Sequence, residues 1–342
     1  MITAPDVPDR DAPRPPMIQP VIFAPAHRKP VEPAEAEYVS LASLLRDMQR
    51  NGVIVVPKGG NGTGSGLTEF YGKFPERYRQ VCAQHLQSLV RMQRLVVVDA
   101  AMHNCSAGTL EDCDNIRALS QIMANTHLML GMQCPQCSVD KSSGATTQQI
   151  SEYQISDAAT MITSTSQRQY LSGTSPNRFY AEIIKPLVQI SNHLTIYDPI
   201  AGNKVDGIHP SLNFARSACL LLHMIDNARK SARRDRYHVT LVTRPPDGPA
   251  WCPAGDLRDA WASALQLATK YPNIIVKVRY KKIWKPEFHH RYYVTERIAL
   301  GIDKGLDIST RDNLLTKMQV DILTDPVAFN AIYEISRAED YR

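Results

Sequence analysis

From Tyr38 onward, hydrophobic positions along the chain alternate between two spacings. Tyr38–Arg50 has apolar residues at the 3.6-residue spacing of an amphipathic helix, and Gly52–Val56 is a β-branched run typical of a buried strand. Further strand-like runs are Arg94–Val98 and His127–Leu130, whereas residues 134–148 are predicted to be a loop. Helices alternating with such strands predict an α/β layer fold with parallel strands.

The second half of the chain repeats this alternation. The predicted helices are Phe179–Ile190, Ser211–Ala228, Asp256–Tyr271 and Val327–Arg337. The predicted strands are His193–Tyr197, Tyr237–Val242 and Asn273–Arg279, with two more short strands on either side of Thr295–Arg297. A turn-rich stretch, Ser172–Pro176, predicts a domain boundary near residue 172. We therefore expect two α/β domains, residues 37–172 and 173–342.

Residues 1–36 have almost no periodic apolar pattern and contain nine of the 23 prolines. Proline removes backbone donors and blocks helix formation, so a segment this rich in proline is predicted to be a disordered or extended arm. It is interpreted either as a solvated tail or as a docking arm for a partner.

The composition is typical of a soluble globular protein with 342 residues, 43% of them apolar. No window approaches eighteen consecutive apolar residues, and no apolar core of a secretory signal is visible at the N-terminus. The seven cysteines have no framework-like spacing, which favours a reducing compartment. A cytoplasmic protein without a membrane span is therefore expected.

Charge is unevenly distributed along the chain. Residues 1–175 carry 15 basic and 16 acidic residues, whereas residues 176–342 carry 24 basic and 18 acidic ones. A basic second half favours an anionic partner there, such as nucleic acid or a phospholipid surface. An ordinary solvated surface is the alternative explanation.

The segment Phe288–Asp307 (FHHRYYVTERIALGIDKGLD) contains the most informative motif. His289 and Arg291 are separated by one residue, and Glu296 follows Arg291 after four others. This spacing resembles a conservative variant of the H-x-K-x4-D signature of the phospholipase D superfamily. It is most similar to the phospholipase D-like domain at the C-terminus of MIT-domain proteins, which has a His-x-Arg and a downstream G-x-G-L-D, here Asp303–Asp307 (DKGLD).

Earlier segments fit the same branch of the superfamily. They are Phe179-Tyr180 and Lys185-Pro186-Leu187, a strand ending at Tyr197-Asp198-Pro199 and a strand ending at Val242-Thr243-Arg244. The resemblance covers about residues 176–310 and implies a phospholipase D-like α/β domain within 173–342.

The resemblance also implies a chemistry. In active members a histidine attacks phosphorus, a second histidine protonates the leaving oxygen, and cations clamp the phosphate. Here it assigns His289 as the nucleophile, Arg291 as the phosphate clamp and Glu296 as the group that orients a histidine or neutralises the cation. Because the chain has a single copy of the motif, a complete catalytic site requires a symmetric homodimer.

Two functions follow from the resemblance. One is a phosphodiesterase, in particular a nuclease or a nucleic-acid-associated effector. The other is a catalytically silent binding module for nucleic acid, anionic lipid or a protein partner.

A basic strand provides a second candidate for anion binding. Lys277, Arg279 and Lys281 alternate along it, so they are expected to share one face, and Trp284 and Tyr280 lie close enough to stack on bases. Lys304, in the DKGLD segment, completes the set of predicted phosphate-binding or nucleic-acid-binding residues. An edge strand protected from aggregation by its lysines is the alternative.

The first domain has weaker signals. A C-x-x-C formed by Cys134 and Cys137, together with Cys105 and Cys113, would supply the soft ligands of a structural zinc site, although free thiols are the default and no other cofactor is expected. Carboxylates faintly resemble the metal-binding arrangement of PIN-like nucleases, and helix capping is the alternative role for most of them. These carboxylates are Asp99, Glu111, Asp112 and Asp114.

Overall fold

The computed structural model describes two compact units. The described residues are Arg14, 16–24, 35–57, Leu67, 71–98, 128–131, 146–163, 166–202, 205–206, 209–210, 212–230, 236–245, 253–266, 271–282 and 290–341. The first unit is Met17–Ser166, and the second unit combines Met1–Pro16 with Gln167–Arg342.

The first unit contains a five-stranded sheet in which every described pairing is parallel. Its strands, in the order β3-β2-β1-β4-β5, are Leu95–Val98, Gly52–Pro57, Gln19–Ala24, Leu128–Gly131 and Thr146–Gln149. Parallel neighbours need crossover connections, and the helices Glu35–Asn51 and Glu76–Arg91 supply those from β1 to β2 and from β2 to β3. The α/β class predicted from the alternating pattern is confirmed for this unit.

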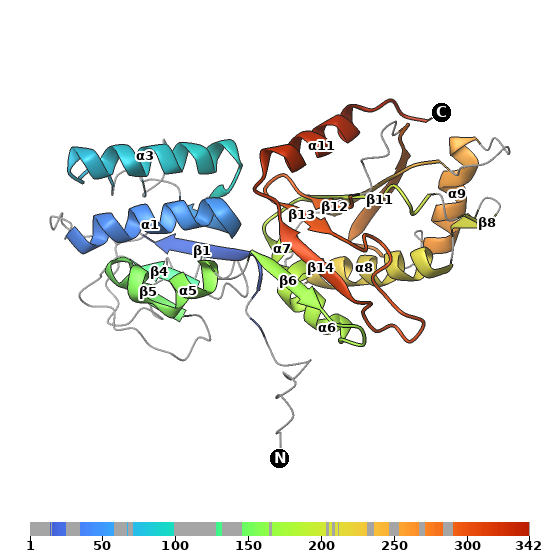
Figure 1. Ribbon diagram of the computed structural model, residues 1–342, viewed down its shortest axis with the longest axis horizontal. Helices are drawn as coiled ribbons and strands as arrows, with labels where there is room; N and C mark the ends of the chain where they lie inside the picture. Colours follow the sequence, from blue (N-terminus) through green and yellow to red (C-terminus); the bar gives the residue numbers. More distant parts are fainter. Residues whose placement is uncertain are drawn as a thin grey trace, which may run out of the picture. The chain divides into compact units, whose positions relative to one another are not determined.

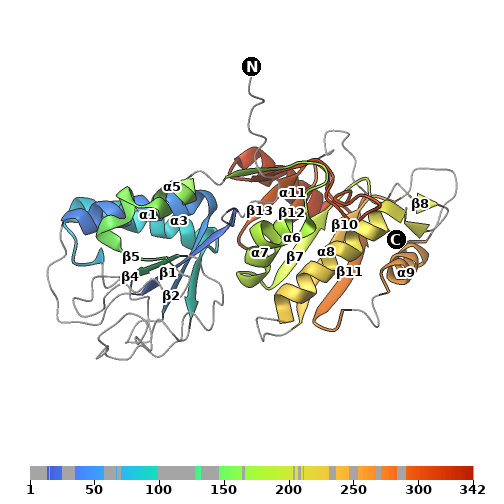
Figure 2. The same ribbon diagram turned by 90° about the horizontal axis from the view of Figure 1, so that it is seen from below.

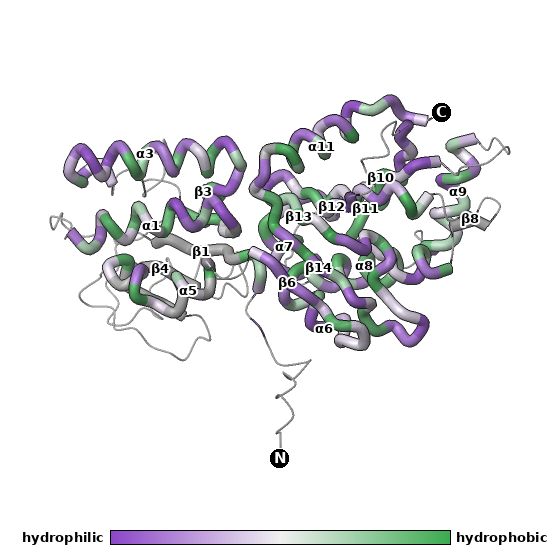
Figure 3. The backbone as a smooth tube through the Cα atoms, in the orientation of Figure 1, coloured by the Kyte–Doolittle hydropathy of each residue, from purple (hydrophilic) through white to green (hydrophobic). Residues whose placement is uncertain are grey.

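The described helices of the first unit lie together on one face of this sheet (Figure 2). They are α1 (Glu35–Asn51), α3 (Glu76–Arg91), the 3-10 helix η2 (Ile150–Ile155) and α5 (Asp157–Thr163). Helix α1 is the centre of the layer, and its Leu41, Leu44 and Met48 are fully buried. Helix α3 buries only one face, and its tube alternates between hydrophobic and hydrophilic stretches in Figure 3.

Strand β1 corrects the interpretation of residues 1–36 as a disordered arm. Gln19–Ala24 forms the central strand, with β2 on one side and β4 on the other. The run Val21–Phe23 is too short to stand out among the surrounding prolines, and only pairing on both sides stabilises it as a strand. Helix α1 also begins inside the predicted arm, at Glu35, and β5 occupies part of the predicted 134–148 loop.

The second unit contains a seven-stranded mixed sheet in the order β11-β10-β7-β12-β13-β14-β6. Strands β11, β10 and β7 are mutually parallel, and the remaining pairs are antiparallel. In that order the strands are Ile274–Tyr280, Tyr237–Thr243, His193–Tyr197, Tyr292–Val294, Ala299–Ile302, Met318–Ile322 and Gln167–Tyr170. Because β6 pairs with β14, the second unit begins before the boundary predicted near residue 172.

Helices cover the two faces of this sheet unequally. In Figure 1, α8 lies below the sheet and α11 above it. The described helical elements are α6 (Pro176–Phe179), the π-helix η3 (Tyr180–Ile184), α7 (Lys185–Gln189), α8 (Leu212–Lys230), α9 (Ala254–Leu265) and α11 (Pro326–Arg337). A two-stranded ribbon pairs β8 (Val205–Asp206) with β9 (His209–Pro210). On the upper face, Ile332 and Ile335 of α11 pack against Tyr197, Val242 and Tyr292.

Candidate functional site

The candidate site lies at the carboxyl end of β7, where Asp198 follows the last strand residue. The side chain of Asp198 is fully buried. Its Oδ1 accepts hydrogen bonds from the backbone N–H of Ile200 (2.9 Å) and Ala201 (3.1 Å), and its Oδ2 accepts one from Leu306 (2.7 Å). The first two bonds form an Asx turn, which redirects the chain as it leaves the strand.

Arg291 lies against this carboxylate. Its Nε is 3.7 Å from Asp198 Oδ1, and its Nη1 donates to the backbone carbonyl of Asp303. The side chain retains only 19% of its full exposure. Its Nη2 makes no hydrogen bond within the described part of the chain, so one edge of the guanidinium is available to a ligand.

Burial raises the pKa of Asp198. The N–H of Leu306, the charge of Arg291 and the N–H groups of Ile200 and Ala201 all act in the opposite direction. Every described hydrogen bond to this carboxyl uses it as an acceptor, which is the arrangement that a carboxylate beside an arginine requires.

Gly305 allows the DKGLD segment to approach this pair. Its φ is +55°, and an added Cβ would lie 2.3 Å from both Asp198 Oδ2 and Arg291 Cδ. The buried hydroxyl of Tyr293 donates to the Gly305 carbonyl at 2.9 Å and so holds the loop in place. The position therefore requires glycine both for its backbone conformation and for the space beside Asp198.

Segments that are distant in the sequence thus meet at one end of the sheet. The N–H of Asp198 donates to the Val242 carbonyl at 3.0 Å, and Thr243 Oγ1 accepts from the N–H of Gly202 at 2.7 Å. Lys304 is exposed on the loop that carries Gly305. The ends of β7 and β10, Arg291 and the DKGLD loop form one constellation, which combines a buried anion with two cations near the surface.

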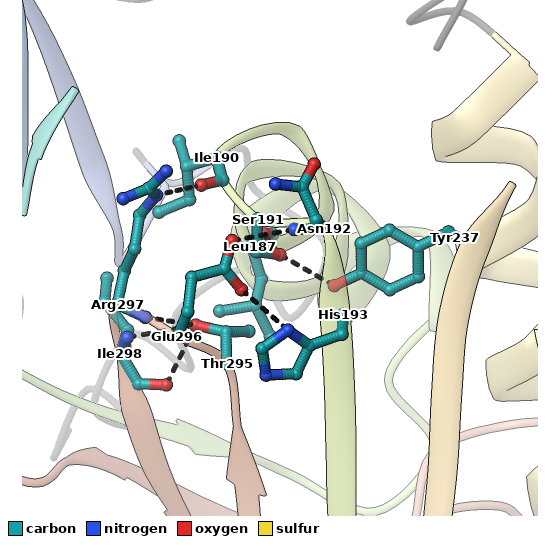
Figure 4. Close-up of polar contacts among 10 residues, drawn as sticks. All are labelled: Leu187, Ile190, Ser191, Asn192, His193, Tyr237, Thr295, Glu296, Arg297 and Ile298. Atoms are coloured by element: carbon teal, nitrogen blue, oxygen red, sulfur yellow. Dashed lines mark hydrogen bonds and ion pairs between the residues drawn. The ribbon is translucent and has the colours of Figure 1, made fainter. Parts of the chain in front are cut away.

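Glu296 does not belong to this constellation. It lies in the turn between β12 and β13, where its Oε1 accepts from the N–H of Asn192 at 2.8 Å and its Oε2 is 3.4 Å from Nδ1 of His193 (Figure 4). His193 is the first residue of β7, so Glu296 contacts the opposite end of that strand from Asp198. The expectation that Glu296 neutralises Arg291 is corrected, because Arg291 pairs with Asp198; the described histidine beside Glu296 is His193.

The surroundings of Glu296 join the β12–β13 turn to the end of α7. Arg297 Nε donates to the Ile190 carbonyl, and Thr295 Oγ1 accepts from the N–H of Ile298 at 3.0 Å (Figure 4). Nearby, Ser191 Oγ is 2.7 Å from the hydroxyl of Tyr237, and burial raises the pKa of that phenol. Arg297 places a cation at the carboxyl end of α7, and Glu296 accepts from the N–H of Asn192. Both contacts are stabilising, so this cluster anchors the turn between β12 and β13.

Several predicted residues lie outside the described part of the chain. They are His289, Trp284, Cys105, Cys113, Cys134, Cys137, Asp99, Glu111, Asp112 and Asp114. His290, the neighbour of His289, is exposed, and its ring centroid is 6.3 Å from that of Tyr292. Within the described ranges, no group of three or more His, Cys, Asp or Glu residues is arranged to hold a metal ion.

The predicted basic strand is β11, and it does not present three free cations. Lys277 is exposed, but Arg279 Nη2 is 2.6 Å from Asp340 Oδ2. Lys281 is 5% exposed, and its Nζ donates to the carbonyls of Ser336 (3.1 Å) and Ala338 (2.6 Å) at the end of α11. Tyr280 is 1% exposed, so it is not available to stack on bases.

Asp198, Gly305 and Asp340 are the residues whose roles the sequence did not reveal. The only signal for Asp198 was its place after an apolar strand and before Pro199. For Gly305 the signal was its place in the DKGLD segment. Asp340 had none, because its partners are some sixty residues earlier in the chain.

The comparisons with known proteins assign no family. No protein-family model, no curated protein and no solved structure matches the chain. Among the described residues, no helix combines the length and apolar character needed to cross a membrane.

Proposed function

We propose that the second unit binds the phosphate group of a phosphodiester through Arg291, and that its ligand is nucleic acid. The observation that carries this proposal is the arrangement of Arg291 beside the buried Asp198, with Nη2 left without a hydrogen bond among the described residues. A guanidinium grips phosphate through paired N–H donors, which makes arginine well suited to this ligand.

The position of the site supports binding. In open α/β sheets, ligands bind beyond the carboxyl ends of the strands where the direction of connection changes. Asp198 follows the carboxyl end of β7, and Arg291 lies against it, so the site is at this edge of the sheet. Lys304 adds a second exposed cation on the adjoining loop.

Binding is favoured over cleavage by the separation of Arg291 from Glu296. In the mechanism of the superfamily, catalysis would depend on His289 from two copies of the chain. A phospholipase D-like binding module is therefore the function that these contacts support best, and the basic second half of the chain favours nucleic acid over a neutral ligand.

The test measures the affinity of the full chain for a fluorescein-labelled 20-nucleotide single strand by anisotropy. We expect Arg291→Ala to weaken binding by roughly tenfold or more, since hydrogen bonds to charged groups contribute about 1.5–3 kcal/mol. Arg311→Ala is the matched control, because Arg311 is exposed, its side chain makes no described contact, and its loss changes the net charge by the same amount. Equal losses in the two variants would refute the site.

A second arm separates binding from catalysis. Wild-type protein and His289→Ala are incubated with DNA, RNA and a generic phosphodiester, and the oligomeric state is measured by light scattering. Cleavage by a dimer that disappears in His289→Ala would replace the binding proposal with the enzymatic one. Preference for vesicles of anionic phospholipid over the oligonucleotide would replace nucleic acid with lipid.

A further inference from the structure

The face of β10 and β11 on the side of α11 is partly uncovered. On this face β11 exposes the side chains of Lys277 and Arg279. Strand β10 contributes Thr240, which is the register partner of Lys277, and the exposed His238 two residues before it. Helix α11 covers only the carboxyl-side part, where Ile332 and Ile335 pack on Val242 and Tyr197. We call Lys277, Arg279, His238 and Thr240 the β10–β11 face.

An exposed face on parallel strands calls for an explanation. Parallel sheets are normally covered on both faces, and their strands are then apolar on both sides. Here Val239 and Leu241 of β10 are buried toward the helices, whereas His238 is exposed on the other side. The exposed groups are polar or cationic, so a complementary partner is polar and anionic rather than apolar.

An acidic segment of the chain already lies at one end of this face. Asp340 accepts from Arg279 at 2.6 Å and is 2.9 Å from Lys281 Nζ, and Glu339 Oε2 is 3.2 Å from Lys282 Nζ. The backbone of the segment pairs with β11 as well, because the N–H of Lys282 donates to the Glu339 carbonyl and the N–H of Tyr341 donates to that of Tyr280.

The ion pairs of this segment differ in how firmly they are held. Lys281 is buried and caps the carbonyls at the end of α11, so it is part of the folded structure. The side chains of Arg279 and Lys282 remain 51% and 39% exposed, and exposed pairs contribute little to stability. Arg279 and Lys282 are therefore the cations that can exchange Asp340 and Glu339 for a more strongly binding anion.

We propose that the β10–β11 face is a docking surface for nucleic acid, and that Glu339 and Asp340 compete with the phosphates for Arg279 and Lys282. Lys277 and Arg279 are two residues apart on one face of an extended strand, so both can follow a phosphate backbone. By this competition, Glu339 and Asp340 lower the affinity of the β10–β11 face for weakly binding polyanions, but they do not block binding. This inference does not depend on the Arg291 site.

The test compares two double variants with the same change in net charge. Glu339→Gln with Asp340→Asn removes the competing carboxylates but keeps hydrogen-bond acceptors for Arg279 and Lys281. Asp312→Asn with Glu334→Gln is the control, because both residues are exposed and no described contact involves their side chains. Affinity for a labelled single-stranded 20-mer is measured from 50 to 200 mM salt on the full chain.

We expect the Glu339/Asp340 variant to bind at least fivefold more tightly than the control variant. Its plot of log affinity against log salt should be steeper by about one to two units, because each gained phosphate contact adds roughly one unit of slope. The gain should persist when Arg291→Ala is added, which separates this surface from the Arg291 site. Equal affinities for the two double variants would overturn the proposed competition.

A second variant keeps the proposal testable if the first one is destabilised. Lys277→Gln changes an exposed side chain that takes part in no described ion pair, so the fold should be unaffected. It should weaken single-strand binding and flatten the salt dependence by about one unit. Unchanged affinity would identify β11 as an edge strand that its cations protect from aggregation.

Discussion

Arg291 and Glu296 lie at opposite ends of strand β12, although only four residues separate them in the sequence. Tyr292 pairs with Tyr197 and Val294 pairs with Thr195, so β12 runs antiparallel along β7. Arg291 consequently contacts Asp198 after the end of β7, and Glu296 contacts His193 at its start. Their partners are about 16 Å apart along the strand at roughly 3.3 Å per residue. The spacing of the motif therefore reflects the length of a strand.

Glu296→Ala should destabilise the protein without affecting phosphate binding. The variant leaves the N–H of Asn192 without its acceptor and removes the partner of His193, for an expected loss of about 1–3 kcal/mol. Urea denaturation measures this loss, and Glu296→Gln, which keeps an acceptor, should lose less. A loss of oligonucleotide affinity at unchanged stability would instead place Glu296 in the binding site.

Asp198→Ala should be among the most damaging single substitutions in the second unit. It leaves Arg291 without its counter-ion and three backbone N–H groups without their acceptor, which together cost about 3–5 kcal/mol. Asp198→Asn should be milder, since its carbonyl oxygen still accepts. Denaturant midpoints of the two variants check this order, and equal midpoints would contradict the role of the carboxylate.

Gly305→Ala should weaken both the fold and the phosphate site. The positive φ and the close approach to Asp198 and Arg291 give an expected cost of about 1–3 kcal/mol. The control is Gly255→Ala, because Gly255 lies in helix α9 with nothing within 4 Å of an added Cβ, and alanine there should stabilise by about 0.5–1 kcal/mol. Thermal unfolding of both variants is the measurement. Equal shifts would show that the DKGLD loop tolerates a side chain at this position.

The Arg279–Asp340 contact should depend on acid pH. The hydrogen bond from Arg279 lowers the pKa of Asp340 below its usual value of 3.8. A carboxyl whose folded pKa is depressed contributes stability that is fully present above its unfolded pKa and is lost as the pH falls through the folded pKa. The difference in melting temperature between wild type and Asp340→Asn should thus be constant above about pH 5 and shrink below pH 4. A difference that persists at pH 2–3 would exclude an ionic contribution.

Local patterns alone sufficed to predict most elements of the second unit. The predicted strand His193–Tyr197 matches β7 residue for residue, because its apolar run is bounded by Asn192 and by Asp198-Pro199. Helix α8 and strand β10 lie within two residues of their predicted bounds for a similar reason. Strand β1 was missed, since a six-residue strand among prolines carries no periodic signal and depends on β2 and β4 for its pairing.

Local patterns along the chain also gave the α/β class and the charged residues that recur in the proposals: Arg291, Lys304, Lys277 and the DKGLD segment. Spacing along the chain reports which face of an element a residue occupies, because the periods of helix and strand are local properties. The tertiary structure alone decided which charges meet. Packing placed Asp198 beneath Arg291, directed Glu296 to His193 and brought Asp340 to Arg279, because strand pairing and helix packing join residues that are distant along the chain.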